Sequence, residues 1–187
     1  MSNGKLFVIS GASGVGKSTV LQRVIQEGEN LFFSVSATTR KPRPGEQDGV
    51  NYFFVSKDTF RKMIARDEFV EYDAHMNNFY GTPKAQLEDK LKAGNVILDI
   101  EPNGAFAVKR QRPEAVLIFI APPSMEELER RLRSRGDTSA QQIELRLERA
   151  KWEMEQRFRY DYIVVNQDAD VCAQEILKIM VEHAHEE

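Results

Sequence analysis

The feature that most constrains this chain is an octapeptide near its start that matches the pattern G-x-x-x-x-G-K-[ST] at every fixed position. It consists of Gly11, Ala12, Ser13, Gly14, Val15, Gly16, Lys17 and Ser18. The octapeptide follows an apolar run, Leu6 to Ile9, that is typical of a buried strand, and it precedes a predicted helix from Ser18 to Ile25. Glycines let the backbone turn tightly and aim several N–H groups at one polyphosphate, and the helix N-terminus favours the same anion. This context predicts a loop that binds a nucleoside triphosphate; the alternative is a glycine-rich turn that only joins strand and helix.

Two side chains of the loop have the chemistry that phosphoryl transfer requires. We expect Lys17 to bring a positive charge to the β- and γ-phosphates and Ser18 to offer its hydroxyl to Mg²⁺. A second metal contact, through a water, is predicted at Asp99, because the apolar run Val96 to Leu98 ends in this carboxylate. Many strands end in an aspartate, so the alternative for Asp99 is a strand end without a metal.

Composition limits the class of protein. The 187 residues suffice for one domain with a sizeable core and a small inserted part, but not for two independent enzymes. A net charge of −3 gives no indication of nucleic-acid binding. The single cysteine, Cys172, excludes an internal disulfide, and the three histidines show no metal-ligand spacing with it. We see no leader and no apolar stretch of membrane length, so we expect a cytoplasmic protein without a membrane partner.

Strand-like and helix-like runs alternate over most of the chain. This alternation predicts an α/β fold with a largely parallel sheet and helices on both faces. Together with the octapeptide, it indicates the P-loop NTPase type. The predicted core strands are continuous and apolar, namely Leu6 to Ile9, Val96 to Ile100, Val116 to Ile120 and Ile163 to Val165. Capping signals predict helices that run from Thr82-Pro83 to Gly94, from Ser124 to Gly136 and from Ser139 to about Arg157, and a last helix carries Ile176, Ile179 and Met180.

The region from about residue 32 to residue 81 interrupts this alternation. Short aromatic or alternating runs surround a stretch rich in proline and glycine, and a helix is predicted from Lys57 to Ala65. The runs are Phe33 to Ser36, Asn51 to Val55 and Phe69 to Tyr72. We therefore predict a small mixed α+β insertion at about 32–81 that holds a second substrate opposite the triphosphate. The core would comprise residues 1–31, 82–123 and 158–187, and a helical lid would comprise about 124–157.

The insertion carries side chains suited to a nucleoside monophosphate. Arg40 and Arg43 can bind phosphate oxygens in pairs, while the hydroxyls of Tyr52 and Tyr80 complete the shell. The alternatives are that the tyrosines belong to a core and that the arginines are surface charges.

A carboxylate and two hydroxyls in the same region suit a guanine base. Guanine presents N1–H and N2–H₂ beside the acceptor O6, so Glu71 could accept from the two donors while Ser36 or Thr82 donates to O6. The alternative for Glu71 is an outward-facing strand residue.

Arginines crowd the two helices predicted after Ser124. Their side chains could form a solvated surface paired with nearby glutamates, or some could stabilise the charge on a transferring phosphoryl group. The turn Gly136-Asp137-Thr138 between the helices is of the flexible kind that a lid requires. The arginines are Arg130, Arg131, Arg133, Arg135, Arg146 and Arg149.

Several segments, in order over nearly the whole chain, together resemble the guanylate kinase family. They are GASGVGKST, SATTRKPRPGEQDGVNYFFV, EFVEY, NFYGTP, IAPPS and IVVN. The resemblance implies reversible transfer of a phosphoryl group from ATP to GMP with Mg²⁺, giving ADP and GDP, in purine nucleotide metabolism and GMP recycling. It implies small-molecule substrates, with dGMP expected beside GMP, and no nucleic-acid partner. It leaves open whether the chain is a monomer or a homo-oligomer.

The resemblance also implies the residues of the site. Those for GMP are Ser36, Arg40, Arg43, Tyr52, Glu71, Tyr80 and Thr82. Those for ATP are Gly11 to Ser18, with Asn166 near the adenine. The catalytic residues implied are Lys17 and the lid arginines Arg131, Arg135 and Arg146.

The chain departs from the family pattern in one place. Where members commonly read Ile-Asp followed by a Gln-Gly turn, this chain reads Ile100-Glu101-Pro102-Asn103-Gly104. Glu101 keeps the charge on a longer side chain, so its expected contact with guanine is direct, shifted or mediated by water. Pro102 removes a backbone donor.

Two other interpretations remain open at this point. One is an interaction module that resembles the enzyme without catalysis, although such modules have a degraded phosphate loop. The other is a kinase for a different nucleoside monophosphate.

Overall fold

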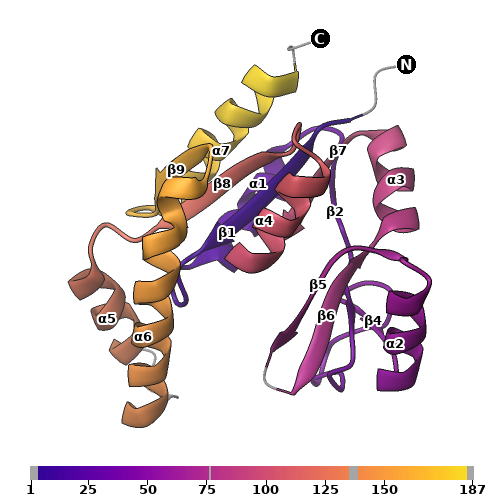
Figure 1. Cartoon of the computed structure of the whole chain (residues 1–187). Helices are drawn as coiled ribbons and strands as arrows, with labels where there is room; N and C mark the ends of the chain where they lie inside the picture. The colour runs from indigo at the N-terminus through magenta and orange to yellow at the C-terminus, as the bar shows by residue number, and fades with distance from the viewer. Residues whose placement is uncertain (1–3, 76, 135–138, 185–187) are drawn as a thin grey trace.

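A five-stranded parallel sheet forms the centre of the fold, in the strand order β2-β7-β1-β8-β9 (Figure 1). The computed structural model describes residues 4–75, 77–134 and 139–184. The strands are β1 (Leu6–Gly11), β2 (Leu31–Phe33), β7 (Asn95–Asp99), β8 (Val116–Ala121) and β9 (Tyr162–Val165). Every residue of β1 and β8 is buried, as expected of central parallel strands that are covered on both faces. All five carboxyl ends therefore lie along one edge of the sheet.

Helices cover both faces of this sheet. Helices α1 (Lys17–Glu27) and α7 (Ala169–Ala184) contact each other, and α4 (Pro102–Gln111) contacts β1 and β8. Figure 1 shows α4 in front of the sheet and α1 behind it, while α3 (Lys84–Ala93) contacts β7. The predicted α/β fold with a parallel core is confirmed. Pro102 is the first residue of α4, where a missing backbone N–H is tolerated because that group has no partner within the helix.

A smaller, four-stranded sheet follows the order β4-β3-β6-β5. Its strands are β3 (Ala37–Thr38), β4 (Phe53–Phe54), β5 (Phe69–His75) and β6 (Asn78–Pro83), with parallel and antiparallel pairs. Helix α2 (Lys57–Ala65) places the fully buried Phe60 against Phe69 and Phe79, with ring centroids 4.5 Å and 5.4 Å away. This lobe has a hydrophobic cluster of its own, separate from the core around the large sheet.

Two helices, α5 (Met125–Ser134) and α6 (Ala140–Gln156), extend beyond the carboxyl edge of the large sheet and are followed by a short 3₁₀ turn, Arg157–Arg159 (Figure 1). Both predicted caps are present. The hydroxyl of Ser124 accepts the N–H of Glu127 at 3.1 Å, and that of Ser139 accepts the N–H of Gln142 at 3.3 Å. Arg135 and the turn Gly136-Asp137-Thr138, predicted between these helices, lie outside the described residues.

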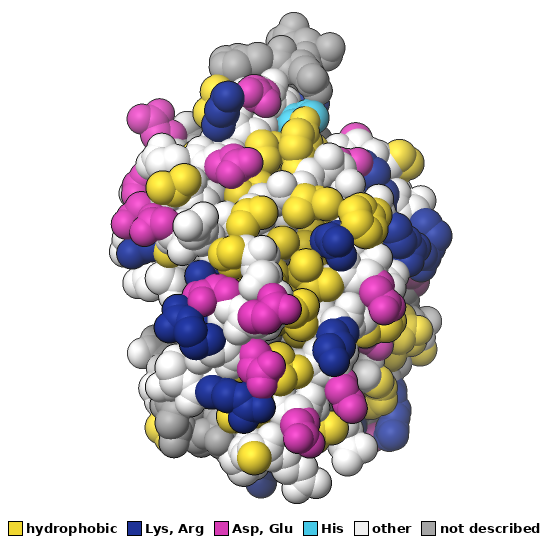
Figure 2. All heavy atoms as spheres, turned by 90° about the vertical axis from the view of Figure 1, so that its left-hand side faces the viewer, with side chains coloured by type: hydrophobic (Ala, Val, Ile, Leu, Met, Phe, Trp, Pro, Cys, Tyr) yellow, Lys and Arg dark blue, Asp and Glu magenta, His cyan; other side chains and the backbone are white. Residues whose placement is uncertain are grey.

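Hydrophobic side chains gather on the side of the molecule that carries α6, α7 and β9 (Figure 2). Strand β9 is the last in the sheet order, and its Ile163 and Val165 are 40% and 47% exposed, whereas Val164 between them is buried. In the part of the chain that the structure describes, no helix combines the length and the apolar character needed to span a bilayer.

Two predicted boundaries were wrong. We expected Phe33 to Ser36 to be a strand of the insertion, but the observed strand, Leu31–Phe33, pairs in parallel with β7 in the large sheet. We also expected Thr82 to cap α3. Thr82 instead lies in β6, a strand that we did not predict, and α3 begins at Lys84 without a side-chain cap. The hydroxyl of Thr82 donates to a carboxylate rather than accepting from the helix.

We expect Phe60→Ala to lower the free energy of unfolding by about 3 to 5 kcal/mol, because it removes the ring at the centre of the small cluster. The matched control Phe158→Ala removes a ring that is 73% exposed and should cost less than about 1 kcal/mol. Urea unfolding followed by circular dichroism measures both. Equal losses in the two variants would contradict a separate packed core in the small lobe.

Candidate active site

Two neighbouring cavities lie at the carboxyl ends of the central strands, and Lys17 and Glu101 border both. The first has a volume of about 720 Å³ and lies between the loop Gly11–Ser18 and α6. The second has a volume of about 300 Å³ and lies between the central sheet and the small lobe. A lysine shared by two cavities can place its charge between the reacting groups of two ligands.

The loop Gly11–Ser18 has the geometry of an anion site. Gly14 and Gly16 have φ of 87° and 93°, in the left-handed region that favours glycine, and Gly16 is the residue that caps α1. The N-terminal amides of α1 therefore point out of the loop, where a phosphate can accept from them. Gly14 also allows close packing, since a Cβ there would lie 2.5 Å from the side chain of Leu132 on α5.

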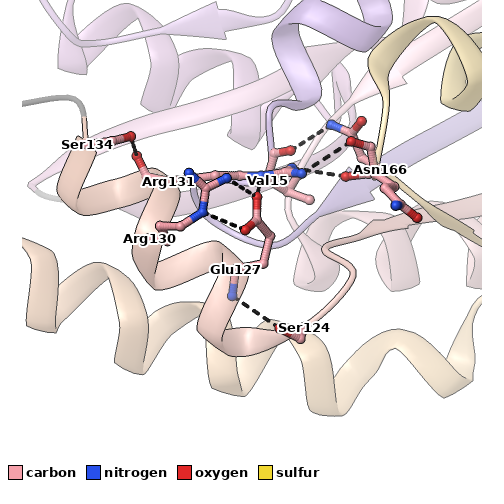
Figure 3. A network of polar contacts seen from close by, with 8 residues as sticks. Val15, Ser124, Glu127, Arg130, Arg131, Ser134 and Asn166 are labelled. Carbon is pink, nitrogen blue, oxygen red and sulfur yellow. Dashed lines mark hydrogen bonds and ion pairs between the residues drawn. The ribbon is translucent and has the colours of Figure 1, made fainter.

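A polar network joins α5 to the loop (Figure 3). The side chain of Asn166 is buried and donates from Nδ2 to the carbonyl of Val15 at 2.7 Å. Arg131 donates to the backbone oxygen of Asn166 at 2.9 Å and to the carboxylate of Glu127 at 2.8 Å. Hydrogen bonds from Arg130 and Arg131 lower the pKa of Glu127 to about 2. Arg131 therefore lies beside the loop but is paired with a glutamate of its own helix.

Lys17 forms an ion pair with Asp99, the last residue of β7. Asp99 and Ser18 also line a third, open cavity of about 420 Å³ beside α1. Hydroxyl and carboxylate oxygens are the ligands that Mg²⁺ prefers, and this ion commonly takes only one or two from the protein, with phosphate and water completing its shell. Within the described residues, no group of three or more His, Cys, Asp or Glu side chains could hold a metal.

The second cavity contains a buried acid. Glu71 on β5 is 7% exposed, and its Oε1 accepts a hydrogen bond from the hydroxyl of Thr82 at 2.6 Å. Burial raises the pKa of Glu71 to about 7, although the hydrogen bond from Thr82 counteracts part of this effect. Gly104 at the start of α4 leaves room for the acid, because a Cβ there would lie 2.8 Å from Glu71 Oε2. The carboxyl group thus changes charge near neutral pH.

Two tyrosines also line this cavity, and an arginine lies next to one of them. The rings of Tyr52 and Tyr80 meet edge to face with centroids 6.2 Å apart, and the guanidinium of Arg40 lies 5.4 Å from the Tyr52 centroid. Arg40 makes two parallel hydrogen bonds to Glu46, at 2.8 and 2.9 Å, and the backbone N–H of Arg43 donates to the same carboxylate. The Arg40 hydrogen bonds lower the pKa of Glu46 to about 2, helped by the Arg43 amide.

A carboxylate of α6 contacts the phosphate-binding loop directly. Glu153 is 3% exposed, and it accepts the backbone N–H of Ser13 at 2.7 Å and Nε of Arg149 at 3.1 Å. Burial raises its pKa, while these two hydrogen bonds act in the opposite direction. Arg149 also pairs with Glu101.

The family model for guanylate kinase matches residues 3–184. The chain belongs to the guanylate kinase family. A guanylate kinase of Thermus thermophilus is 49% identical over 178 residues, which are 95% of this chain and 80% of that protein. One from Clostridioides difficile is 47% identical over 177 residues, 94% of this chain and 86% of that protein.

Solved structures agree with this assignment. The guanylate kinase of Anaplasma phagocytophilum superposes with a TM-score of 0.81 at 35% identity, over 99% of this chain and 88% of that chain. The SH3-kinase fragment of tight junction protein 3 superposes with a TM-score of 0.51 at 13% identity, over 98% of this chain and 59% of that chain, and shows the fold alone. Guanylate kinases are nucleoside monophosphate kinases, so the chain is a transferase of this class.

The structure brings most of the residues implied by the guanylate kinase resemblance to the two cavities. The second cavity is lined by Ser36, Tyr52, Glu71, Tyr80 and Glu101, and the first by Gly11–Ser18 and Arg146. Thr82 and Arg40 line neither cavity, but Thr82 contacts Glu71 and Arg40 contacts Tyr52. The lining of the second cavity does not include Arg43, and Arg135 lies outside the described residues.

Sequence reasoning missed two acids of this guanylate kinase site. Asp73 lines the second cavity together with Glu71, two residues before it on β5, and the two-residue period of a strand could have indicated this. Glu153 lies seven residues after Arg146, and both line the first cavity. A spacing of seven on a helix is the available signal.

Because the pKa of Glu71 is raised to about 7 from an ordinary 4.5, the folded chain binds this proton more tightly than the unfolded chain. The contribution of Glu71 to stability is therefore greatest at low pH and is lost as the pH rises toward 7. We expect Glu71→Gln, which stays neutral, to gain stability relative to the wild type by about 2 to 3 kcal/mol between about pH 5 and pH 8. Chemical denaturation across this range measures the difference, and a value independent of pH would contradict the prediction.

Proposed function

We propose that this guanylate kinase transfers the γ-phosphoryl group of ATP to GMP in the presence of Mg²⁺ and releases ADP and GDP. The observation that carries the proposal is the buried pair Glu71 and Thr82, in a cavity that shares Lys17 with the cavity of the phosphate-binding loop. A base-binding cavity and a triphosphate-binding cavity that share Lys17 are suited to direct transfer of a phosphoryl group between two nucleotides.

Glu71 is the proposed reader of guanine. Its ionised carboxylate accepts from N1–H and N2–H₂, while the hydroxyl of Ser36, which lines the same cavity, donates to O6. Thr82 orients the carboxylate through its hydrogen bond. Glu101, which lines the same cavity, is proposed as a second acceptor for guanine. Adenine would turn the wrong edge toward Glu71 and leave this buried group unpaired, which is costly.

The GMP phosphate is proposed to bind at Arg40, Arg43, Tyr52 and Tyr80. Arg40 already pairs with an anion, since its guanidinium makes two hydrogen bonds to Glu46. Two oxygens of a phosphate can accept the same pair of parallel hydrogen bonds, so the phosphate can take the place of Glu46 on Arg40. Glu46 then serves to orient Arg40 before the ligand arrives.

The ATP phosphates are proposed to accept from the amides of Gly11–Ser18 and from Lys17. We place Asn166 in this site as well, where its hydrogen bond to Val15 supports the loop. Ser18 and Asp99, which share a cavity, would hold Mg²⁺, Asp99 through a water. An ion held there would supply positive charge that offsets the charge developing on the phosphates.

No protein nucleophile is required for the transfer. A phosphate oxygen of GMP attacks the γ-phosphorus in line, the bond from this phosphorus to the oxygen of the β-phosphate breaks, and ADP leaves. Lys17 together with Arg131, Arg135 and Arg146 offsets the charge on the migrating group. To reach the migrating group, Arg131 would give up its hydrogen bond to Glu127 and donate to the phosphoryl oxygens instead. Closure of α5 and α6 as a lid excludes the water that would otherwise hydrolyse ATP.

The proposed parts of the molecule are a core, a lid at about 124–157 and an inserted GMP-binding lobe. Since β2 pairs within the large sheet and β6 extends to Pro83 in the small sheet, we place the lobe after Phe33 and through Pro83, instead of at about 32–81. We further propose that the chain acts in the cytoplasm, in purine nucleotide metabolism and GMP recycling, with small molecules rather than nucleic acid or membranes as partners.

An assay of ADP release with ATP and each of GMP, AMP, CMP, UMP and dTMP tests the proposed substrate. We expect turnover with GMP and little with the others, because only guanine pairs both donors with Glu71. Lys17→Ala should abolish turnover while the protein stays folded, which controls for a contaminating kinase. Turnover that is fastest with another monophosphate would contradict the proposal, and dGMP run beside GMP tests the tolerance of the ribose site.

We expect Glu71→Ala to lower kcat/KM for GMP by about a hundredfold or more, since it removes the acceptor for two guanine donors. Binding of ATP should persist, because the loop Gly11–Ser18 is not altered. The control Asp58→Ala removes an exposed carboxylate of the same lobe and should leave the kinetics unchanged. Wild-type kinetics with GMP in Glu71→Ala would show that another residue reads the base.

A further inference from the structure

Arg149 on α6 connects the two cavities. Its guanidinium pairs with Glu101, which borders both cavities, and its Nε donates to Glu153 at 3.1 Å. Glu153 in turn accepts the backbone N–H of Ser13 in the phosphate-binding loop at 2.7 Å. An unbroken series of polar contacts thus runs from the wall of the second cavity, through α6, to the loop that borders the first.

Each member of this series depends on the next. The carboxylate of Glu153 is almost fully buried, so it requires the charge and hydrogen bond of Arg149 as well as the Ser13 amide. The side chain of Arg149 is 31% exposed and that of Glu101 is 42% exposed, so nucleotides can reach both. A ligand that engages Glu101 therefore changes the electrostatic surroundings of the arginine that also contacts Glu153.

We propose that Arg149 is a positioning residue that couples the two nucleotide sites, so that GMP and ATP each strengthen the binding of the other. This inference rests on the proposed function of the two cavities. The Glu101–Arg149 pair fixes α6 against the second cavity, and the Glu153–Ser13 contact fixes the loop against α6. Binding of either nucleotide therefore stabilises these contacts, and with them the wall of the other site. Such a coupling is reciprocal, so each nucleotide lowers the Kd of the other by the same factor.

The chain contains its own reporter for this coupling. Trp152, the single tryptophan of the sequence, lines a small cavity of about 270 Å³ together with Arg149 and Glu101, and its side chain is 39% exposed. A change at the Glu101–Arg149 pair therefore changes the surroundings of the indole, and fluorescence titration can follow it.

The test compares the Kd of GMP with and without saturating adenosine 5′-(β,γ-imido)triphosphate and Mg²⁺, measured by Trp152 fluorescence and by calorimetry. In the wild type we expect the ATP analogue to lower the Kd of GMP by about fivefold or more. Arg149→Gln should bring this ratio close to one, and Arg149→Lys, which keeps the charge without the fork of donors, should restore part of it. The control Arg133→Gln removes the same charge from an exposed pair with Glu129 and should leave the ratio unchanged.

A double variant separates the series of contacts from unrelated effects. If Glu101 acts through Arg149, the ratio in Glu101→Gln with Arg149→Gln should equal that in Arg149→Gln alone. The inference is overturned if the wild-type ratio is one. It is also overturned if Arg149→Gln weakens one nucleotide alone and leaves the ratio intact, which would indicate direct contact with that ligand. Failure of the proposed function would look different, because the wild type would then neither bind GMP nor phosphorylate it.

Discussion

The parallel pairing of β1 with β7 and β8 determines where the functional groups of this guanylate kinase lie. β1 leads into the phosphate-binding loop, β7 ends at Asp99, and the turn after β9 carries Asn166. Parallel strands present their carboxyl ends at one edge, so these groups converge although they are far apart in the sequence. The inserted lobe and the helix pair are both attached at this edge, and the two cavities form between them and the sheet.

Short sequence patterns were sufficient to predict the elements whose conformation depends on neighbouring residues. The glycine pattern predicted the loop, apolar runs predicted four strands of the large sheet, and helix α2 was predicted with the bounds that the structure has. The failures concern residues whose role depends on a distant partner. A threonine such as Thr82 can cap a helix or donate to a carboxylate, and only the pairing of β5 with β6 brings Glu71 within reach. Likewise, nothing local assigns Leu31–Phe33 to one sheet or the other.

The resemblance to the family named many of the residues that line the two cavities, but it missed Asp73 and Glu153. It also did not indicate the contacts of Arg40 with Glu46 or of Arg149 with Glu101. Those contacts depend on which carboxylate lies nearest to a guanidinium in the folded chain, and sequence spacing does not contain that information. Each of these two guanidinium groups is oriented by a carboxylate of the folded chain.

The buried acid of the second cavity has a consequence for acid–base balance. Burial raises the pKa of Glu71 to about 7, so its carboxyl group changes charge near neutral pH. Guanine can donate two hydrogens only to the acceptor-only, ionised form. On the proposed function, binding of guanine therefore releases protons from Glu71 into solution. A lower pH would weaken the binding of GMP, because it protonates Glu71.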